Sequence, residues 1–164
     1  MTKDGLKTEL RKRGEWDSPE QETYINLLRT HSLLSQRFDR LFREHGISSP
    51  QYNILRILRG HDDEGLPSLE IASQMITCVP DITRLLDRLE KAGYVRRERS
   101  TEDRRVVRVR ITNQGRKFLT KLDGPIHDSE QASLGHMTRK ELKELSRLMT
   151  KARLSALVND SDLQ

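Results

Sequence analysis

The chain has 164 residues, of which 34% are hydrophobic and 34% charged, and this balance argues against a large self-contained core and favours long helices that bury surface against a partner. Its single cysteine excludes an intramolecular disulfide and a multi-cysteine zinc site, and no stretch approaches the roughly 20 apolar residues of a membrane span. The net charge of +5 favours a polyanionic partner, while 4% aromatic residues argue against stacking platforms for single-stranded nucleic acid.

The first 17 residues form a basic extension without the apolar run of a signal peptide, which predicts a flexible segment on a cytoplasmic protein. Residues 18–46 are then expected to form one long helix. Ser18 is a candidate N-cap, Gln21 can close a capping box, and Gly46 can end the helix. Its apolar residues recur with a period near 3.6. Because such a helix would be roughly 40 Å long, it should reach beyond one small domain.

Residues 47–112 are predicted to form three helices and a β-hairpin. The helices are expected over residues 49–60, 69–75 and 78–92, each with apolar residues at helical spacing. The last two are short and are joined by a tight turn at residues 76–77, which is typical of a helix-turn-helix.

Two strands follow at once, over residues 94–99 and 107–111. In the second strand, apolar residues alternate with arginines, so one face should be buried and the other basic. A helix-turn-helix followed by such a hairpin is a winged helix. The apolar face comprises Val107, Val109 and Ile111, and the basic face comprises Arg108 and Arg110.

The positive charge is concentrated in residues 84–110. This segment holds ten basic and five acidic residues, whereas the rest of the chain holds 20 of each. Nine of the ten basic residues are arginines, whose planar guanidinium suits phosphates and guanine edges. The winged helix is therefore predicted to bind nucleic acid through its last helix and its hairpin.

Residues 113–158 are predicted to form two more helices, with a kink at Pro125 and a second capping box at residues 138–141. A small winged-helix core cannot cover the apolar faces of these helices and of residues 18–46, so we expect all of them to serve dimerisation. Residues 159–164 should be a tail. The predicted fold is mainly α with a small β-wing: a winged helix-turn-helix core flanked by N- and C-terminal dimerisation helices.

The chain resembles the MarR family in three motifs: residues 82–95 (ITRLLDRLEKAGYV), 103–105 (DRR) and 111–115 (ITNQG). The resemblance covers about residues 20–157. It implies a transcriptional regulator rather than an enzyme, which binds double-stranded DNA as a homodimer and represses until a small ligand releases it. The sequence departs from the family at residues 78–81 (CVPD), which replace a small polar run, and in its longer basic extension.

The helix over residues 78–92 is expected to enter the major groove with its N-terminal half toward the base edges. Arg84 is expected to bind a guanine, and Thr83 a thymine methyl group or a phosphate. Two roles stay open for Asp81, which can accept a hydrogen bond from cytosine or compensate the charge of the helix N-terminus. Arg88 can contact DNA, or it can pair with Asp87 of the same helix or with an acid of a neighbouring subunit.

At the wing tip, Asp103 is expected to orient Arg105 into the minor groove through a charge-assisted hydrogen bond, as the resemblance also implies. Arg104, Arg108 and Arg110 should bind flanking phosphates. Asp87 and Glu90 would repel phosphates, so we expect them to lie further back and to hold arginines in place. The candidate DNA contacts are Pro80, Asp81, Thr83, Arg84, Arg88, Asp103, Arg104, Arg105, Arg108 and Arg110.

Two-fold symmetry would place the recognition helices at half-sites ~34 Å apart, which predicts a pseudo-palindromic operator. The resemblance implies that an aromatic or phenolic ligand lies between the dimerisation helices and the winged-helix core. Candidate lining residues are His31, Arg37, Tyr52 and Arg56, although ordinary interface or surface roles are an open alternative.

Four further alternatives need to be considered. Cys78 near the recognition helix is either a redox-active thiol or an inert one. The wing could bind another protein instead of DNA. A metal-dependent enzyme is disfavoured because the five histidines fall in different elements without ligand spacing, so no metal and no cofactor are predicted. Activation rather than repression depends on operator position, which the chain does not encode.

Overall fold

The computed structural model describes residues 5–61, 64–99 and 106–161, with side chains up to residue 154. It divides into two compact units, Met1–Thr120 and Lys121–Gln164. The first unit contains the elements α1 (Gly5–Leu10), α2 (Pro19–Glu44), α3 (Ser49–Gly60), β1 (Leu66–Pro67), α4 (Ser68–Ser73), α5 (Ile82–Lys91), β2 (Val95–Arg99) and β3 (Val107–Ile111). Helix α6 (Asn113–Leu134) begins in this unit and continues into the second, which also holds α7 (Arg139–Ser161).

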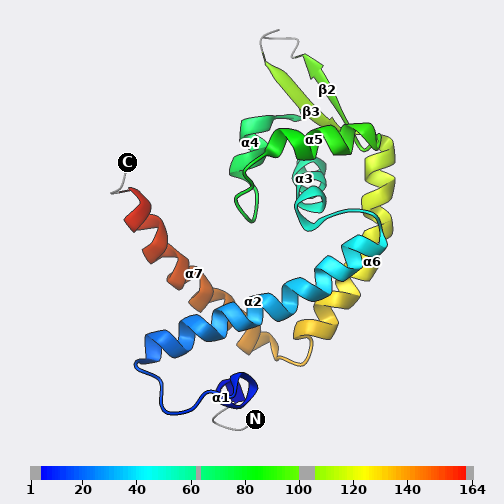
Figure 1. Cartoon of the computed structure of the whole chain (residues 1–164). Helices are drawn as coiled ribbons and strands as arrows, with labels where there is room; N and C mark the ends of the chain where they lie inside the picture. The colour runs from blue at the N-terminus through cyan, green and yellow to red at the C-terminus, as the bar shows by residue number, and fades with distance from the viewer. Residues whose placement is uncertain (1–4, 62–63, 100–105, 162–164) are drawn as a thin grey trace. The chain divides into compact units, whose positions relative to one another are not determined.

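The fold class predicted from the sequence, mainly helical with a small β-wing, is confirmed. The three strands form one antiparallel sheet in the order β1-β3-β2. In Figure 1, β2 and β3 extend as a hairpin beyond α4 and α5, and α3 lies beneath α5. Strand β1 was not predicted, because two residues are too few to show a periodicity. It pairs Leu66 with Val109 and Pro67 with Arg108.

The core of the first unit lies where α3, α4 and α5 meet the sheet. The side chains buried there come from every one of these elements: Ile54, Leu55 and Leu58 of α3, Ile71 of α4, Leu86 and Leu89 of α5, and Val95, Val109 and Ile111 of the strands. Val107 does not share this burial, although the alternating pattern predicted it would, because it lies at the end of β3 away from the core and is exposed.

Helix caps explain where the helices start. The Ser18 hydroxyl accepts a hydrogen bond from the Gln21 amide at 3.1 Å, so the predicted N-cap of α2 is present. The predicted capping box is displaced, because the Gln21 side chain accepts from the amide of Asp17 rather than Ser18. Helix α3 has a complete capping box between Ser48 and Gln51.

Helix α5 starts four residues later than the sequence predicted. Residues 78–81 are not helical, and the helix begins at Ile82 with Asp81 as its N-cap. The physical reason is Pro80, which disfavours a helical conformation at Val79, followed by a carboxylate that can bond the amide of Arg84.

The motif at residues 112–115 joins the end of α5 to the start of α6. The Thr112 hydroxyl donates to the carbonyl of Gly93 at 2.7 Å and accepts from the amide of Gly115 at 3.0 Å. A Cβ atom at Gly115 would lie 2.3 Å from the Tyr94 carbonyl oxygen, so the backbones approach too closely for any other residue. The Thr-x-x-Gly spacing is therefore a packing requirement.

In the second unit, α6 continues through Pro125 as one helix up to Leu134. The predicted capping box of α7 is confirmed, since the Thr138 amide donates to Glu141 at 2.8 Å and the Glu141 amide donates to the Thr138 hydroxyl at 3.3 Å. In the part of the chain with described positions, we find no helix with the length and apolar character that a bilayer crossing requires.

Candidate nucleic-acid interface

Helix α5 presents a polar face to solvent and an apolar face to the core. Leu86 and Leu89 are buried, whereas Thr83, Arg84 and Arg88 are exposed. Neither Arg84 nor Arg88 forms an ion pair with any acid in the described parts of the chain. The two guanidinium groups are thus available to an external anion, and the intrahelical pair with Asp87 considered for Arg88 is not formed.

Asp81 caps α5. Its Oδ1 atom accepts a hydrogen bond from the amide of Arg84 at 2.9 Å. This bond satisfies one of the amides that a helix N-terminus leaves without a partner. Pro80, directly before it, is exposed. Of the two roles left open for Asp81, the structure therefore contains the one at the helix end, and a base contact stays a prediction.

Arg97 on β2 ties the wing to α5. Its Nη2 atom lies 2.6 Å from Asp87 Oδ1, its Nη1 atom 2.5 Å from Glu90 Oε2, and its backbone amide donates to Glu90 Oε1 at 3.0 Å. Partial burial opposes the charge, but the hydrogen bonds to Asp87 and Glu90 prevail and raise the pKa of Arg97 above its ordinary value. We call these three residues the Arg97 clamp.

The Arg97 clamp explains why a helix predicted to face DNA carries two acidic residues. Asp87 and Glu90 hold an arginine, as expected, but the sequence did not indicate which one. Arg97 lies seven residues from Glu90 and ten from Asp87 in sequence, and it meets them because β2 packs against α5. The signal that could have found the clamp is the position of Arg97 on the strand face shared with buried Val95.

Three other wing arginines have partners within the first unit. Arg108 donates to the carbonyl of Gly65 at 3.1 Å. Arg110 lies 3.1 Å from Glu98, which also pairs with Arg96 at 3.1 Å. Arg108 and Arg110 were predicted as phosphate ligands, and the structure gives both an additional bracing role. Asp103, Arg104 and Arg105 lie outside the described residues.

The candidate ligand-pocket residues fall into two groups. On α3, the Tyr52 ring stacks on Phe42 with 4.7 Å between ring centroids, and Arg56 Nη1 lies 3.3 Å from the Tyr52 hydroxyl. On α2, His31 and Arg37 are both exposed, and the His31 ring lies 3.3 Å from the Ser35 hydroxyl. The structure thus brings Tyr52 and Arg56 together.

Cys78 is exposed in the segment between α4 and α5. The helix expected to begin at residue 78 begins instead at Ile82, so Cys78 lies before its first turn. The helix dipole acts within that turn, so it does not favour a reactive thiol at Cys78.

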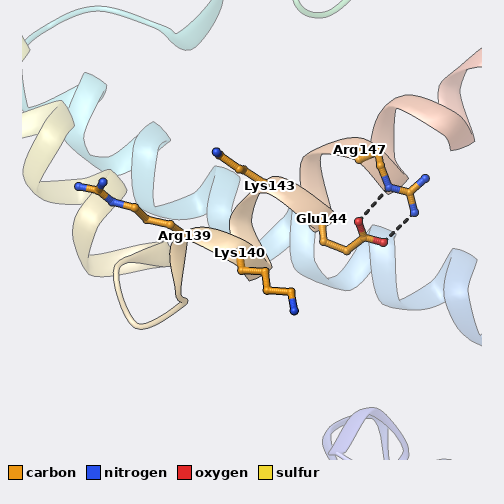
Figure 2. A pocket seen from close by; sticks show the side chains of 5 residues that line it. All are labelled: Arg139, Lys140, Lys143, Glu144 and Arg147. Atoms are coloured by element: carbon orange, nitrogen blue, oxygen red, sulfur yellow. Dashed lines mark hydrogen bonds and ion pairs between the residues drawn. The ribbon is translucent and has the colours of Figure 1, made fainter.

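A second cationic cluster lies at the start of α7, in the other unit, and the sequence reasoning missed it. It borders a hollow of about 520 Å³. Figure 2 shows Glu144 joined to Arg147 by two hydrogen bonds, of 2.7 and 2.8 Å. All of its lining residues come from α7, and four of them are basic. The lining residues are Arg139, Lys140, Lys143, Glu144 and Arg147.

Comparison with known proteins places this geometry among transcriptional regulators. The model of the MarR family matches residues 47–107. The HTH-type transcriptional regulator PapX of Escherichia coli is 33% identical over 95 residues, which span 58% of either protein and so less than two thirds of PapX. The transcriptional repressor MprA of Escherichia coli K12 is 26% identical over 145 residues, which cover 80% of this chain and 82% of MprA.

Solved structures extend the similarity over most of the chain. A MarR transcription factor from Planctomyces limnophilus is 42% identical with a TM-score of 0.64, covering 83% of this chain and 98% of that one. Sco3205 from Streptomyces coelicolor, solved in complex with DNA, has 23% identity, a TM-score of 0.73 and coverages of 87% and 91%. CouR from Rhodococcus jostii RHA1, bound to p-coumaroyl-CoA, has 17% identity, a TM-score of 0.71 and coverages of 84% and 95%. The last two share the fold.

Proposed function

This chain belongs to the MarR family of winged-helix, DNA-binding transcriptional regulators, which are not enzymes, and we propose that it acts as a homodimeric repressor released by a small ligand. The observation that carries the proposal is the exposed face of α5, where Arg84 and Arg88 have no acid partner in the described parts of the chain while the Arg97 clamp holds the wing beside them. Such a face can enter the major groove with its cations directed at bases and phosphates.

Within this docking, Arg84 and Thr83 would contact base edges, and Arg88 would bind a phosphate. Asp103 would orient Arg105 in the minor groove, so Asp103→Ala is expected to weaken DNA binding although it removes a negative charge. A rise in affinity for that variant would contradict the orienting role. The complex of Sco3205 with DNA supports the docking only as an analogy of fold.

The homodimer is supported by apolar side chains that remain exposed on the flanking helices. On α2 these are Tyr24, Leu27 and Leu28, and on α7 they include Leu148 and Leu154. Contiguous exposed apolar groups on helices mark interaction surfaces. Sedimentation equilibrium should give twice the chain mass, and a Leu28→Asp variant should shift the equilibrium toward monomer. A monomeric wild type that still binds DNA tightly would contradict this part of the proposal.

The ligand proposal rests on Tyr52 and Arg56, which combine an aromatic ring with a guanidinium group. This pair suits an aromatic carboxylate, because the ring can stack and the guanidinium can form a bidentate hydrogen bond. CouR, which has this fold, binds p-coumaroyl-CoA. Titration of the protein–DNA complex with simple phenolic and aromatic acids should release DNA from the wild type and not from an Arg56→Ala variant.

The decisive experiment is selection of bound genomic fragments by the purified protein at moderate salt, followed by affinity measurements on the enriched duplex. Arg84→Ala should abolish the preference for that duplex, whereas Arg153→Ala, an exposed arginine on α7, should leave it unchanged. A reporter placed behind the operator then gives the sign of regulation. If no duplex is enriched and Arg84→Ala binds DNA like the wild type, the proposal fails.

A further inference from the structure

The two most exposed of the large hydrophobic side chains in the described parts of the chain both lie in the helix-turn-helix. Ile76 is 85% exposed and Leu69 is 82% exposed, while the next, Tyr24 on α2, is 63% exposed. Single apolar side chains are common on protein surfaces and need no explanation by themselves. Both, however, lie in the motif that we propose approaches DNA, and this shared location requires an explanation.

Ile76 is held in place from its backbone. Its amide donates a hydrogen bond to Asn53 Oδ1 of α3 at 2.8 Å. The preceding residue, Met75, is fixed to the end of α4 by a bond from its amide to the Ala72 carbonyl. Because a β-branched side chain is also stiff about its first torsion, Ile76 presents a fixed apolar group to solvent.

The location of Ile76 indicates which group on DNA its side chain would contact. Ile76, Thr77 and Cys78 form an exposed run that leads to the Asp81 cap of α5, the end of the recognition helix that approaches base edges. The thymine C5-methyl is the apolar group that base edges offer in the major groove. An isoleucine side chain has no hydrogen-bond donor or acceptor, so it could not bond to the polar groups of the base edges.

We propose that Ile76 is a specificity-determining residue that contacts a thymine methyl group in each operator half-site. The proposal rests on the docking described under the proposed function and extends the base-reading surface beyond the recognition helix into the turn before it. A docking site for another protein is the competing explanation of the same exposure, and the experiment below separates the two.

The first measurement is selection from a random-core duplex library with the wild type, Ile76→Ala and Leu10→Ala. Leu10→Ala is the matched control, because it truncates an exposed apolar side chain on α1, outside both the proposed dimer surface and the proposed DNA contacts. We expect the wild type and the control to require thymine at one position per half-site, and Ile76→Ala to lose the requirement at that position alone. Ile76→Val should keep part of it.

The second measurement replaces that thymine by deoxyuridine in the selected duplex, which removes only the methyl group. The affinity of the wild type should fall roughly fourfold per half-site, the ratio that burial of one methyl group gives. The affinity of Ile76→Ala should not change between the two duplexes, and the slope of affinity against salt should be the same for all variants.

The outcomes distinguish this inference from the function on which it rests. If the wild type enriches one duplex but Ile76→Ala shows the same preference, or if deoxyuridine leaves wild-type affinity unchanged, the inference is wrong and the regulator function stands. If the wild type enriches no duplex at all, both fail. Equal thermal midpoints for the variants exclude misfolding as the cause of a lost preference.

Discussion

Removal of the Arg97 clamp should loosen the wing without removing a DNA contact. Arg97→Met keeps the aliphatic stem and the hydrogen bond from the backbone amide to Glu90, and it deletes the side-chain hydrogen bonds to Asp87 and Glu90. A hydrogen bond to a charged group contributes ~1.5–3 kcal/mol when well buried, but exposed ion pairs contribute only ~0.2–1 kcal/mol. The Arg97 side chain is 26% exposed, that of Glu90 39% and that of Asp87 59%. The contribution of the Arg97–Glu90 pair should therefore lie between these two ranges, and that of the Arg97–Asp87 pair in the lower range. We therefore expect a loss of about 1–2 kcal/mol in the free energy of unfolding.

Urea unfolding followed by far-ultraviolet circular dichroism measures this loss, with all variants at one protein concentration because the stability of the proposed homodimer would depend on it. A cycle of Arg97→Met, Glu90→Gln and the double variant isolates the coupling of that pair. Arg99→Met, two residues along β2 and exposed, is the matched control.

DNA binding by the same variants tests whether Arg97 itself contacts DNA. Arg97→Met should weaken binding modestly while the slope of log affinity against log salt stays that of the wild type. If the variant is as stable as the wild type and its slope falls by about 0.9, Arg97 binds a phosphate and the clamp is not its role.

Three further predictions concern local geometry. Asp81→Ala should lower the free energy of unfolding by about 1 kcal/mol through loss of the α5 cap, whereas Asp81→Asn should not, because asparagine also caps helices. If Asp81→Asn is as stable as the wild type but binds the operator more weakly, the carboxylate of Asp81 contacts a base. Gly115→Ala should cost about 1–3 kcal/mol in urea unfolding, because its Cβ would meet the Tyr94 carbonyl, and an unchanged midpoint would contradict that contact. Hydrogen bonds from the Thr138 amide and hydroxyl lower the pKa of Glu141, so its stabilising effect is present above an unfolded pKa of about 4.3 and is lost as pH falls through the lower folded value. Glu141→Ala should therefore melt below the wild type at pH 7 and together with it at about pH 2, and an equal gap at both would refute the linkage.

The sequence predicted those features that repeat or that occupy a fixed spacing. The helices of the core follow from the 3.6-residue period, and the capping box of α7 follows from Thr138 and Glu141 three residues apart. The hairpin follows from alternation in residues 107–111, although this alternation also placed exposed Val107 in the core. Periodicity reports which residues are apolar and does not report where the core ends.

The remaining features depend on packing between elements. The Arg97 clamp needs β2 to lie against α5, and β1 exists only because β3 offers an edge to two residues. The start of α5 was misplaced because apolar spacing outweighed Pro80, although proline before a capping aspartate is itself a start signal. Exposure of Ile76 could not be foreseen, since an apolar residue in a turn is normally assigned to the core.

The joint formed by Thr112 and Gly115 has a consequence for how such a protein is regulated. Its hydrogen bonds connect the start of α6 to Gly93, directly after α5, so the first turns of α6 and the recognition helix are expected to move together. If a ligand releases this chain from DNA, as we propose, a ligand that reorients these turns of α6 would move the recognition helix with them. Such a ligand would not need to compete with DNA for the base-contacting side chains, and substitutions in α6 should then alter the coupling between ligand binding and DNA binding.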